Sequence, residues 1–359
     1  MIDLDPSIKF DLEDTANILS ILGEDYTAES DLVKIKLCIR NLIWITYRKS
    51  FPYISISYSS SDHGWGCMIR CGQMILAQIL QRKYPNKQRK LILKDFLDSF
   101  YSKFSIQNIA KKGETKVNKT IGGWYGPSSI SRVLQALSDE IKDPNISNVN
   151  IIIGYDSTVY LDKLIQQEPF NGVALFIPLM LGVGYINTIY IKQLIKCIRD
   201  PCSVGFIGGK PKRAFWFIGY SETSNQLLYL DPHTTQESIV RPKHYQTNAP
   251  SIQYDTESED EKIMIDSLDF DVESYYPQNI FSAEFSEIDC SLSLAFFFPT
   301  VESIHDWAKR MKNDIIENKN SAILSILDTK PQYMNTETNV DPDDEFIVCD
   351  SDPEFELIN

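Results

Sequence analysis

The chain has 359 residues, of which 43% are hydrophobic, 11% aromatic and 23% charged, a composition that excludes a fibrous or mostly disordered protein. It carries 35 basic and 49 acidic residues, which gives a formal net charge of −14. The acidic residues concentrate in the stretches 251–275 and 331–359, which hold nine each. The rest of the chain is close to neutral, and it has no basic stripe of the kind that binds nucleic acid.

Hydrophobic periodicity divides the chain into two halves. Apolar residues at helical spacing predict four helices in the first half, over residues 32–47, 68–80, 91–104 and 129–137. The polar stretches between them predict loops over 55–66 and 105–123. Short β-branched and aromatic runs predict strands in the second half, over 149–153, 172–177, 204–207, 214–220, 226–230 and 292–298, and a helix follows over 301–316. Helices followed by a mostly antiparallel sheet indicate an α+β fold.

Composition also suggests the domain organisation and the compartment. We expect one domain over 1–328 with an acidic surface insertion near 251–275, followed by a disordered acidic tail over 329–359. No basic segment followed by an apolar one opens the sequence, so no secretory signal is predicted. The apolar stretch 173–184 is too short to cross a bilayer. Seven cysteines, a low and odd number, favour reduced thiols in the cytoplasm, and we expect a monomer.

The histidines limit where a histidine base can lie, because the chain has only four. His233 ends a predicted strand in which Tyr229, Asp231 and His233 share one face. A carboxylate two residues before a histidine on the same face can orient the imidazole and stabilise its charged form. A turn residue that caps a strand end would produce the same Asp-x-His pattern, so the pattern alone leaves both interpretations open.

Cys67 is the candidate nucleophile. It follows Gly64 and Gly66, which let the backbone approach a substrate closely, and it opens the helix predicted from residue 68. A thiol at a helix N-terminus faces unpaired N–H groups and the positive end of the dipole, so we expect the thiolate to be favoured. The cysteine N–H can also help to bind a developing oxyanion. The other six cysteines are interpreted as buried thiols.

Two competing sites share or adjoin these residues. His63, Cys67 and Cys71 are spaced four residues apart, but a structural zinc site needs a fourth ligand and no paired Cys or His motif supplies it. The segment 208–210 resembles part of a phosphate-binding loop, but Pro211 stands where Ser or Thr is needed. We therefore expect neither a metal nor another cofactor.

Five blocks of sequence are distinctive when taken together, and they run from Trp44 to Pro52, from Ser61 to Cys67, from Gly123 to Pro127, from Gly208 to Tyr220 and from Tyr229 to Gln236. In this order they resemble the autophagins, the autophagy-related cysteine peptidases. The resemblance extends from about residue 21 to 312. It implies a papain-like fold with a small auxiliary subdomain. It also implies cleavage after a glycine near the C-terminus of ubiquitin-like autophagy modifiers, and release of these modifiers from phosphatidylethanolamine.

The resemblance also implies a role for individual residues. Cys67 would be the nucleophile, His233 the general base and acid, and Asp231 the residue that orients the histidine. Tyr47 would support the oxyanion, and Trp124 would cover the glycine tail of the substrate. A narrow aromatic cover suits a glycine tail, because only glycine has no side chain to exclude. Without the resemblance, Tyr47 and Trp124 would be interpreted as core residues.

The resemblance further implies substrate contacts outside the catalytic group. Pro211 would lie against Trp124 in a loop that gates the groove, and Val183 would make an apolar contact with the modifier. Met180 stands where a basic residue is expected, which weakens the expected polar contacts of that segment.

Near the end of the acidic tail, Phe355 and Ile358 stand three residues apart with acids upstream. Such a segment can add as a strand to a partner's sheet and fill two pockets, and it resembles the short motifs that bind ubiquitin-like autophagy modifiers. We therefore expect a cysteine peptidase whose partner is such a modifier and which contacts membranes only through it. The alternative hypothesis is a non-catalytic binding protein for the same modifiers.

Overall fold

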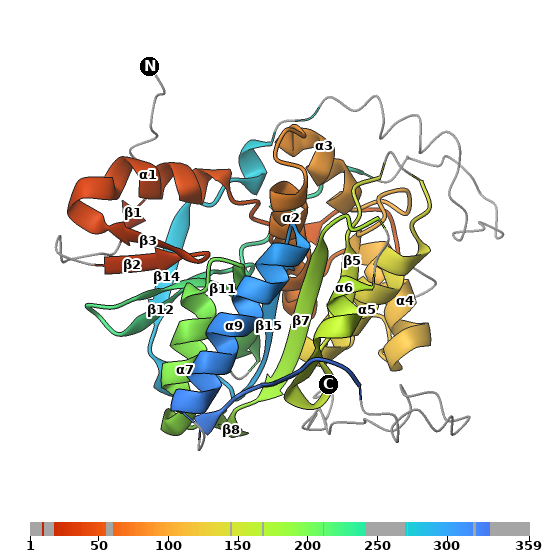
Figure 1. Ribbon diagram of the computed structural model, residues 1–359. Helices are drawn as coiled ribbons and strands as arrows, with labels where there is room; N and C mark the ends of the chain where they lie inside the picture. The colour runs from red at the N-terminus through yellow and green to blue at the C-terminus, as the bar shows by residue number, and fades with distance from the viewer. Residues whose placement is uncertain are drawn as a thin grey trace, which may run out of the picture.

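The computed structural model describes residues 9–10, 18–54, 60–143, 146–166, 169–210, 212–241, 270, 272–318 and 321–330. Its centre is a ten-stranded sheet (Figure 1). Eight strands follow one another in the order β1 (Lys9–Phe10), β14 (Asn279–Ala283), β12 (Gln226–Leu230), β11 (Arg213–Ser221), β10 (Ser203–Lys210), β15 (Ser291–Phe298), β7 (Val173–Met180) and β5 (Asn150–Ile153). β2 (Ile18–Ile21) also pairs with β11, and β3 (Glu24–Thr27) pairs with β2.

Most neighbours in this sheet run antiparallel, and the parallel pairs are β1 with β14 and β5 with β7. Three small two-stranded sheets accompany it. They pair β4 (Arg48–Lys49) with β13 (Gln236–Glu237), β6 (Thr158–Tyr160) with β16 (Ser325–Leu327), and β8 (Gly182–Val183) with β9 (Tyr185–Ile186). The predicted α+β class is confirmed, with an antiparallel sheet formed mainly by the second half of the chain.

The described helices lie on both faces of the sheet. The α-helices are α1 (Ala28–Asn41), α2 (Cys67–Lys83), α3 (Arg89–Leu93), α4 (Ile106–Val117), α5 (Pro127–Glu140), α6 (Leu161–Ile165), α7 (Thr188–Arg199) and α9 (Val301–Glu317). Short 3-10 helices are η1 (Lys94–Phe96), η2 (Tyr155–Ser157), η3 (Glu273–Tyr275) and η4 (Phe285–Glu287). Figure 1 shows α7 and α9 side by side across one face of the sheet.

Strand β11 separates two hydrophobic cores, because successive side chains of a strand point to opposite faces. Ala214, Trp216 and Ile218 join a core with residues of α1, α2, α4 and α5. Phe215 and Phe217 join the other core, together with residues of α7 and α9. The sheet therefore lies between two helical layers, and α2, which begins with the candidate nucleophile, packs directly on β10 and β11.

The helix predicted over 32–47 is wrong at its C-terminal end. α1 ends at Asn41, and residues 42–47 continue as an extended, buried segment. The Trp44 N–H donates to the Tyr275 carbonyl, and the Tyr47 N–H donates to the Pro232 carbonyl. An uninterrupted apolar run has no clear period, so the sequence alone does not separate a buried helix from a buried extended segment.

The loop predicted over 105–123 is also wrong, since it contains α4. Ser105 caps this helix, because its hydroxyl accepts a hydrogen bond from the Asn108 N–H. Its buried apolar face is narrow and consists of Ile106, Ile109, Ala110 and Gly113, at the spacing of successive helical turns, with the polar Gln107 buried beside it. The many polar residues of the segment conceal that face.

Two further helical segments differ from the prediction. Residues 91–104 form not one helix but the end of α3, then η1, then turns. Helix α7 was not predicted at all, although its side chains Leu194, Cys197 and Ile198 pack into the second core. The predicted strands are present, with ends that differ by up to three residues, and α9 confirms the last predicted helix.

The predicted division at residue 328 stays a prediction, and residues 331–359 lie outside the described residues. Most of the stretch 251–275 lies outside them too. Its final residues form η3, where Tyr275 is only 1% exposed, so this end of the stretch belongs to the core and not to a surface insertion. No helix within the described ranges is both long and apolar enough to cross a membrane.

Candidate active site

Cys67 is the first residue of α2, and a tight loop leads into it. The carbonyl of Asp62 accepts hydrogen bonds from the N–H groups of Trp65 and Gly66. Gly64 has a φ of +87°, and a Cβ on Gly66 would lie 2.4 Å from an oxygen of the Asp62 carboxylate. Both glycines are thus required by the loop itself, in addition to any role in substrate access.

A buried ion-pair cluster holds this loop in place. Arg70 Nε lies 2.7 Å from the Asp62 carboxylate, and Arg70 Nη1 lies 2.8 Å from the Asp98 carboxylate. All three side chains are at most 2% exposed. Asp62 also accepts a hydrogen bond of 2.7 Å from the Arg48 N–H. The cluster therefore joins the loop before Cys67, helix α2 and the segment that carries Tyr47.

His233 and Asp231 lie just beyond the end of β12. The Asp231 Oδ1 atom lies 2.5 Å from the His233 Nδ1 atom and accepts a hydrogen bond of 2.8 Å from the His233 N–H. The Trp44 indole N–H donates to the Asp231 carbonyl at 2.8 Å. Of the two interpretations that the Asp-x-His pattern left open, this geometry favours a carboxylate that orients the imidazole.

Tyr47 connects the two halves of the site. Its hydroxyl hydrogen-bonds the Cys67 sulfur, and its ring packs at 5.4 Å, edge to face, against the His233 ring. The side chain is almost fully buried. The fold thus gathers Cys67, Tyr47, His233 and Asp231, which come from three separate segments of the chain.

The electrostatics of Cys67 differ from the expectation. Burial raises the pKa of the Cys67 thiol, and Asp62 adds to the rise, although the Tyr47 hydroxyl and the N–H groups of Ala214 and Met68 act in the opposite direction. This direction is opposite to the expected preference for thiolate, because the loss of solvent around a sulfur that is 0% exposed disfavours the charged form.

The pKa of Asp231 shifts the other way. Burial alone would raise it, but the hydrogen bonds from the His233 ring and N–H, together with the nearby charges of His233 and Arg213, lower it. Asp231 therefore stays ionised beside the imidazole. The other ring nitrogen of His233, Nε2, is buried and has no hydrogen-bond partner within the part of the chain that the structure describes.

His63 lies on the other side of Tyr47. Its ring packs at 5.4 Å against the Tyr47 ring, and its Nδ1 atom lies 2.8 Å from the Thr235 hydroxyl. Among the described residues, no three His, Cys, Asp or Glu side chains are grouped so that they could hold a metal ion. His63 thus lies next to the site, where it packs against Tyr47 and hydrogen-bonds Thr235.

The remaining predicted residues lie further out. Trp124 is half-buried just before α5 and packs against the first core. Val183 lies at the end of β8 and is 92% exposed. Pro211, Phe355 and Ile358 lie outside the described residues, so their roles stay predictions.

Sequence reasoning missed the residues that support the site. Arg70 offered a signal, since an arginine among the apolar residues of a buried helix requires a charged partner. No local sequence signal marked the other three, Asp62, Asp98 and Trp44. Each of them contacts a residue that is distant in the sequence, and in two cases the partner is a backbone group.

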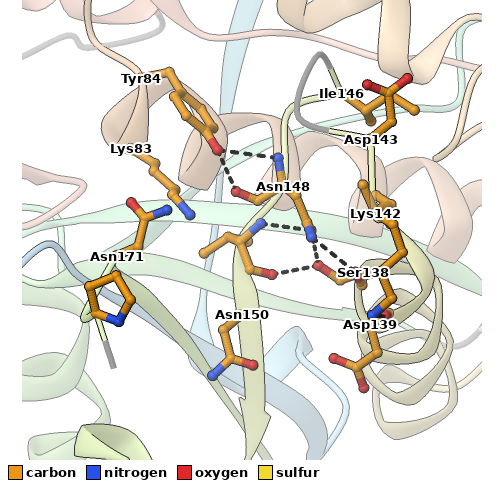
Figure 2. A pocket seen from close by; sticks show the side chains of 13 residues that line it. Lys83, Tyr84, Ser138, Asp139, Lys142, Asp143, Ile146, Asn148, Asn150 and Asn171 are labelled. Carbon is orange, nitrogen blue, oxygen red and sulfur yellow. Dashed lines mark hydrogen bonds between the residues drawn. The ribbon is translucent and has the colours of Figure 1, made fainter. Parts of the chain in front are cut away.

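A separate pocket of about 620 Å³ lies at the other end of α2 (Figure 2). Lys83 and Tyr84 line one side, and Ser138 and Lys142 line another. Sixteen residues of helix separate Cys67 from Lys83, a rise of about 24 Å. None of the predicted site residues lines this pocket, so it is not the candidate active site.

Comparison with known proteins identifies the family. The profile of the peptidase C54 catalytic domain matches residues 33–310. The cysteine protease ATG4B of Xenopus laevis is 31% identical, with 97% of this chain and 95% of the relative covered. The ATG4B of Gallus gallus is 29% identical with 98% of each covered, and the human cysteine protease ATG4A is 28% identical with 89% and 84% covered. This chain belongs to the peptidase C54 family and is a cysteine peptidase of papain-like fold.

Proposed function

We propose that the protein cleaves the bond after the C-terminal glycine of a ubiquitin-like autophagy modifier, both in its precursor and in its conjugate with phosphatidylethanolamine. The observation that carries this proposal is the contact of Tyr47 with both the Cys67 sulfur and the His233 ring, while Asp231 holds the far side of that ring. This arrangement suits attack of a thiolate on a carbonyl.

In the first step, the Cys67 thiol transfers its proton to His233 Nε2, and the sulfur attacks the glycine carbonyl carbon. The negative charge that develops on the carbonyl oxygen is stabilised by the Tyr47 hydroxyl and by N–H groups at the start of α2. Asp231 stabilises the imidazolium that forms, since its Oδ1 atom stays hydrogen-bonded to Nδ1.

In the second step, His233 returns the proton to the departing nitrogen, and the C–N bond breaks to leave a thioester on Cys67. Water, deprotonated by His233, then releases the glycine carboxylate. The precursor and the lipid conjugate present the same glycine carbonyl, and they differ only beyond the nitrogen. One reaction centre therefore serves for both.

We assign the docking of the modifier to the β8–β9 hairpin and its flanks. Four large apolar side chains are exposed there, namely those of Met180, Val183, Tyr185 and Ile189. An exposed apolar cluster of this kind is typical of a protein-binding surface. Contacts join this hairpin to the end of β10, since the Ile186 N–H donates to the Ile288 carbonyl and Lys210 pairs with the neighbouring Glu287 at 3.0 Å.

The other predicted parts fit around this centre. Trp124 would cover the glycine tail, Pro211 would gate the groove, and Phe355 with Ile358 would hold a second modifier surface. We expect the protein to act as a monomer in the cytoplasm and to meet membranes through its lipid-conjugated substrate. The alternative, a protein that binds modifiers without cleaving them, gives no reason for an Asp231–His233 pair beside Cys67.

Two substrates test the proposal. The first is a modifier precursor with an extension beyond its glycine, and the second is the modifier conjugated to phosphatidylethanolamine in vesicles. We expect the wild-type protein to cut both immediately after the glycine, as mass spectrometry of the products would show, and Cys67→Ser to cut neither. Val183→Asp should raise KM without lowering kcat. Binding without cleavage by the wild type would instead support the binding protein, and cleavage of the precursor alone would contradict the lipid activity.

A further inference from the structure

We propose that Arg213 is a positioning residue for the catalytic base, and that it sets the pH range of the reaction. This inference rests on the roles proposed above for Asp231 and His233. Arg213 is the first residue of β11 and the last residue of the segment 210–213, which is expected to gate the groove.

The two oxygens of the Asp231 carboxylate have different partners. Oδ1 binds the His233 ring at 2.5 Å, whereas Oδ2 lies 3.0 Å from Arg213 Nη2. A carboxylate held at one oxygen only can rotate about its terminal bond and exchange its two oxygens. The arginine therefore fixes the carboxylate in the rotation that keeps Oδ1 on the imidazole.

Arg213 also contacts Phe215, whose ring packs against the imidazole of His233. Its guanidinium lies over the Phe215 ring at 5.4 Å, and the Phe215 ring packs at 5.4 Å against the His233 ring. A planar guanidinium can stack on a ring and bind a carboxylate oxygen at the same time, whereas a lysine ammonium does this poorly. One side chain thus contacts both groups that hold the base.

The charges around Asp231 give this contact an electrostatic consequence. Arg213 is the cation beside the Asp231 carboxylate. The negative charge of Asp231 also acts on two neutral groups, the Tyr229 phenol and the Cys71 thiol. Arg213 helps to keep the Asp231 carboxylate ionised, because its positive charge lowers the pKa of that carboxyl group. Without the arginine, we expect the acidic limb of the activity profile to move upward, because protonation beside the imidazole is opposed less strongly.

Two substitutions separate the charge from the packing. Arg213→Met keeps an apolar side chain over Phe215 but removes the charge, and Arg213→Lys keeps the charge but loses the planar fork. In low salt we expect Arg213→Met to lower kcat about fivefold with KM unchanged, and to move the acidic limb up by about 0.5 pH unit. Arg213→Lys should keep the acidic limb of the activity profile at its wild-type pH but should not reach the wild-type kcat. In 1 M salt the wild-type limb should approach that of Arg213→Met, because salt screens a half-exposed charge.

The control is Arg199→Met, which removes a partly exposed arginine that pairs with Asp25 and Glu222 away from the site. It should leave the profile unchanged. An NMR titration of the His233 ring gives the same comparison without turnover, with the same upward movement expected in Arg213→Met. Identical ring titrations in wild type and Arg213→Met would overturn the inference. Absence of wild-type cleavage would instead contradict the proposed function.

Discussion

Two arginines hold carboxylates on either side of the proposed reaction centre, in opposite surroundings. Arg70 binds Asp62 and Asp98 beneath the nucleophile loop, where all three side chains are at most 2% exposed. Arg213 binds Asp231 beside the base, where the arginine side chain is 52% exposed and the carboxylate 18%. The same chemical pair thus occurs once in the interior and once at the surface of one site.

The difference in burial decides what each pair does. Removing one partner of a buried pair leaves an uncompensated charge and costs about 3–5 kcal/mol, whereas an exposed pair contributes about 0–1 kcal/mol. The Arg70 cluster therefore maintains the fold of the loop that carries Cys67. The Arg213 pair can tune the base without putting the stability of the fold at risk.

The largest effect is expected where the base depends on its carboxylate. Asp231→Ala should lower kcat/KM by about 10³–10⁴-fold, because the imidazole loses the group that orients it and stabilises its charged form. The unfolding free energy should change by less than about 1 kcal/mol, since the carboxylate is partly solvated. Steady-state kinetics and urea unfolding check both halves of this statement. A loss of stability that accounts for the lost activity would contradict it.

The second prediction concerns the buried arginine. Arg70→Met should lower the unfolding free energy by about 3–5 kcal/mol, because Asp62 and Asp98 would face each other without a cation. Chemical denaturation measures this loss, and Arg213→Met in the same experiment should cost less than about 1 kcal/mol. Equal losses in the two variants would remove the distinction between the two pairs.

A third substitution tests the residue that joins the two sides. Tyr47→Phe keeps the ring against His233 but removes the hydroxyl that binds the Cys67 sulfur. The expected result is a fall in kcat of about 10²-fold with little change in KM, since an oxyanion donor acts only in the transition state. Unchanged kcat would show that the tyrosine only packs.

The smallest effect concerns Asp95, a carboxyl group that is buried away from solvent. The Asp95 side chain accepts a hydrogen bond from the Ser147 N–H at 3.2 Å, and burial raises its pKa from 3.8 to about 6. A raised pKa means that the protonated form favours folding, so this contribution is present below pH 4 and is lost as the pH rises to 6. Asp95→Asn should remove that fall and stabilise the protein at pH 7 by about 1–2 kcal/mol. Stability curves against pH for the two proteins would reveal it, and parallel curves would contradict the assignment.

The sequence predicted the parts of the site that are local. Asp231 and His233 stand two residues apart just beyond the end of β12, and Cys67 follows the glycines that its loop requires. Tyr47 came only from the resemblance, because its contact with His233 joins residues 186 positions apart. The groups that act on the Cys67 thiol are distant too, since Tyr47 and Ala214 of β11 lower its pKa while burial raises it.

The fold shows the same division between local and distant causes. Strands made of short aromatic or β-branched runs, such as β11 and β12, were predicted nearly to the residue. Helix α4 was missed because only a narrow face is apolar, and α1 was extended too far because residues 42–47 are apolar without a period. In both places, the surrounding structure and not the segment itself selects the conformation.

Capture of the nucleophile tests the central claim most directly. A modifier whose C-terminal glycine carboxylate is replaced by a vinyl sulfone would be incubated with the wild type, with His233→Ala and with Cys67→Ser, and the adduct would be located by peptide mapping. The account predicts a single adduct on Cys67 in the wild type, formed at least about 10²-fold more slowly in His233→Ala and absent in Cys67→Ser. An adduct on another cysteine, or equal rates with and without the imidazole, would contradict it.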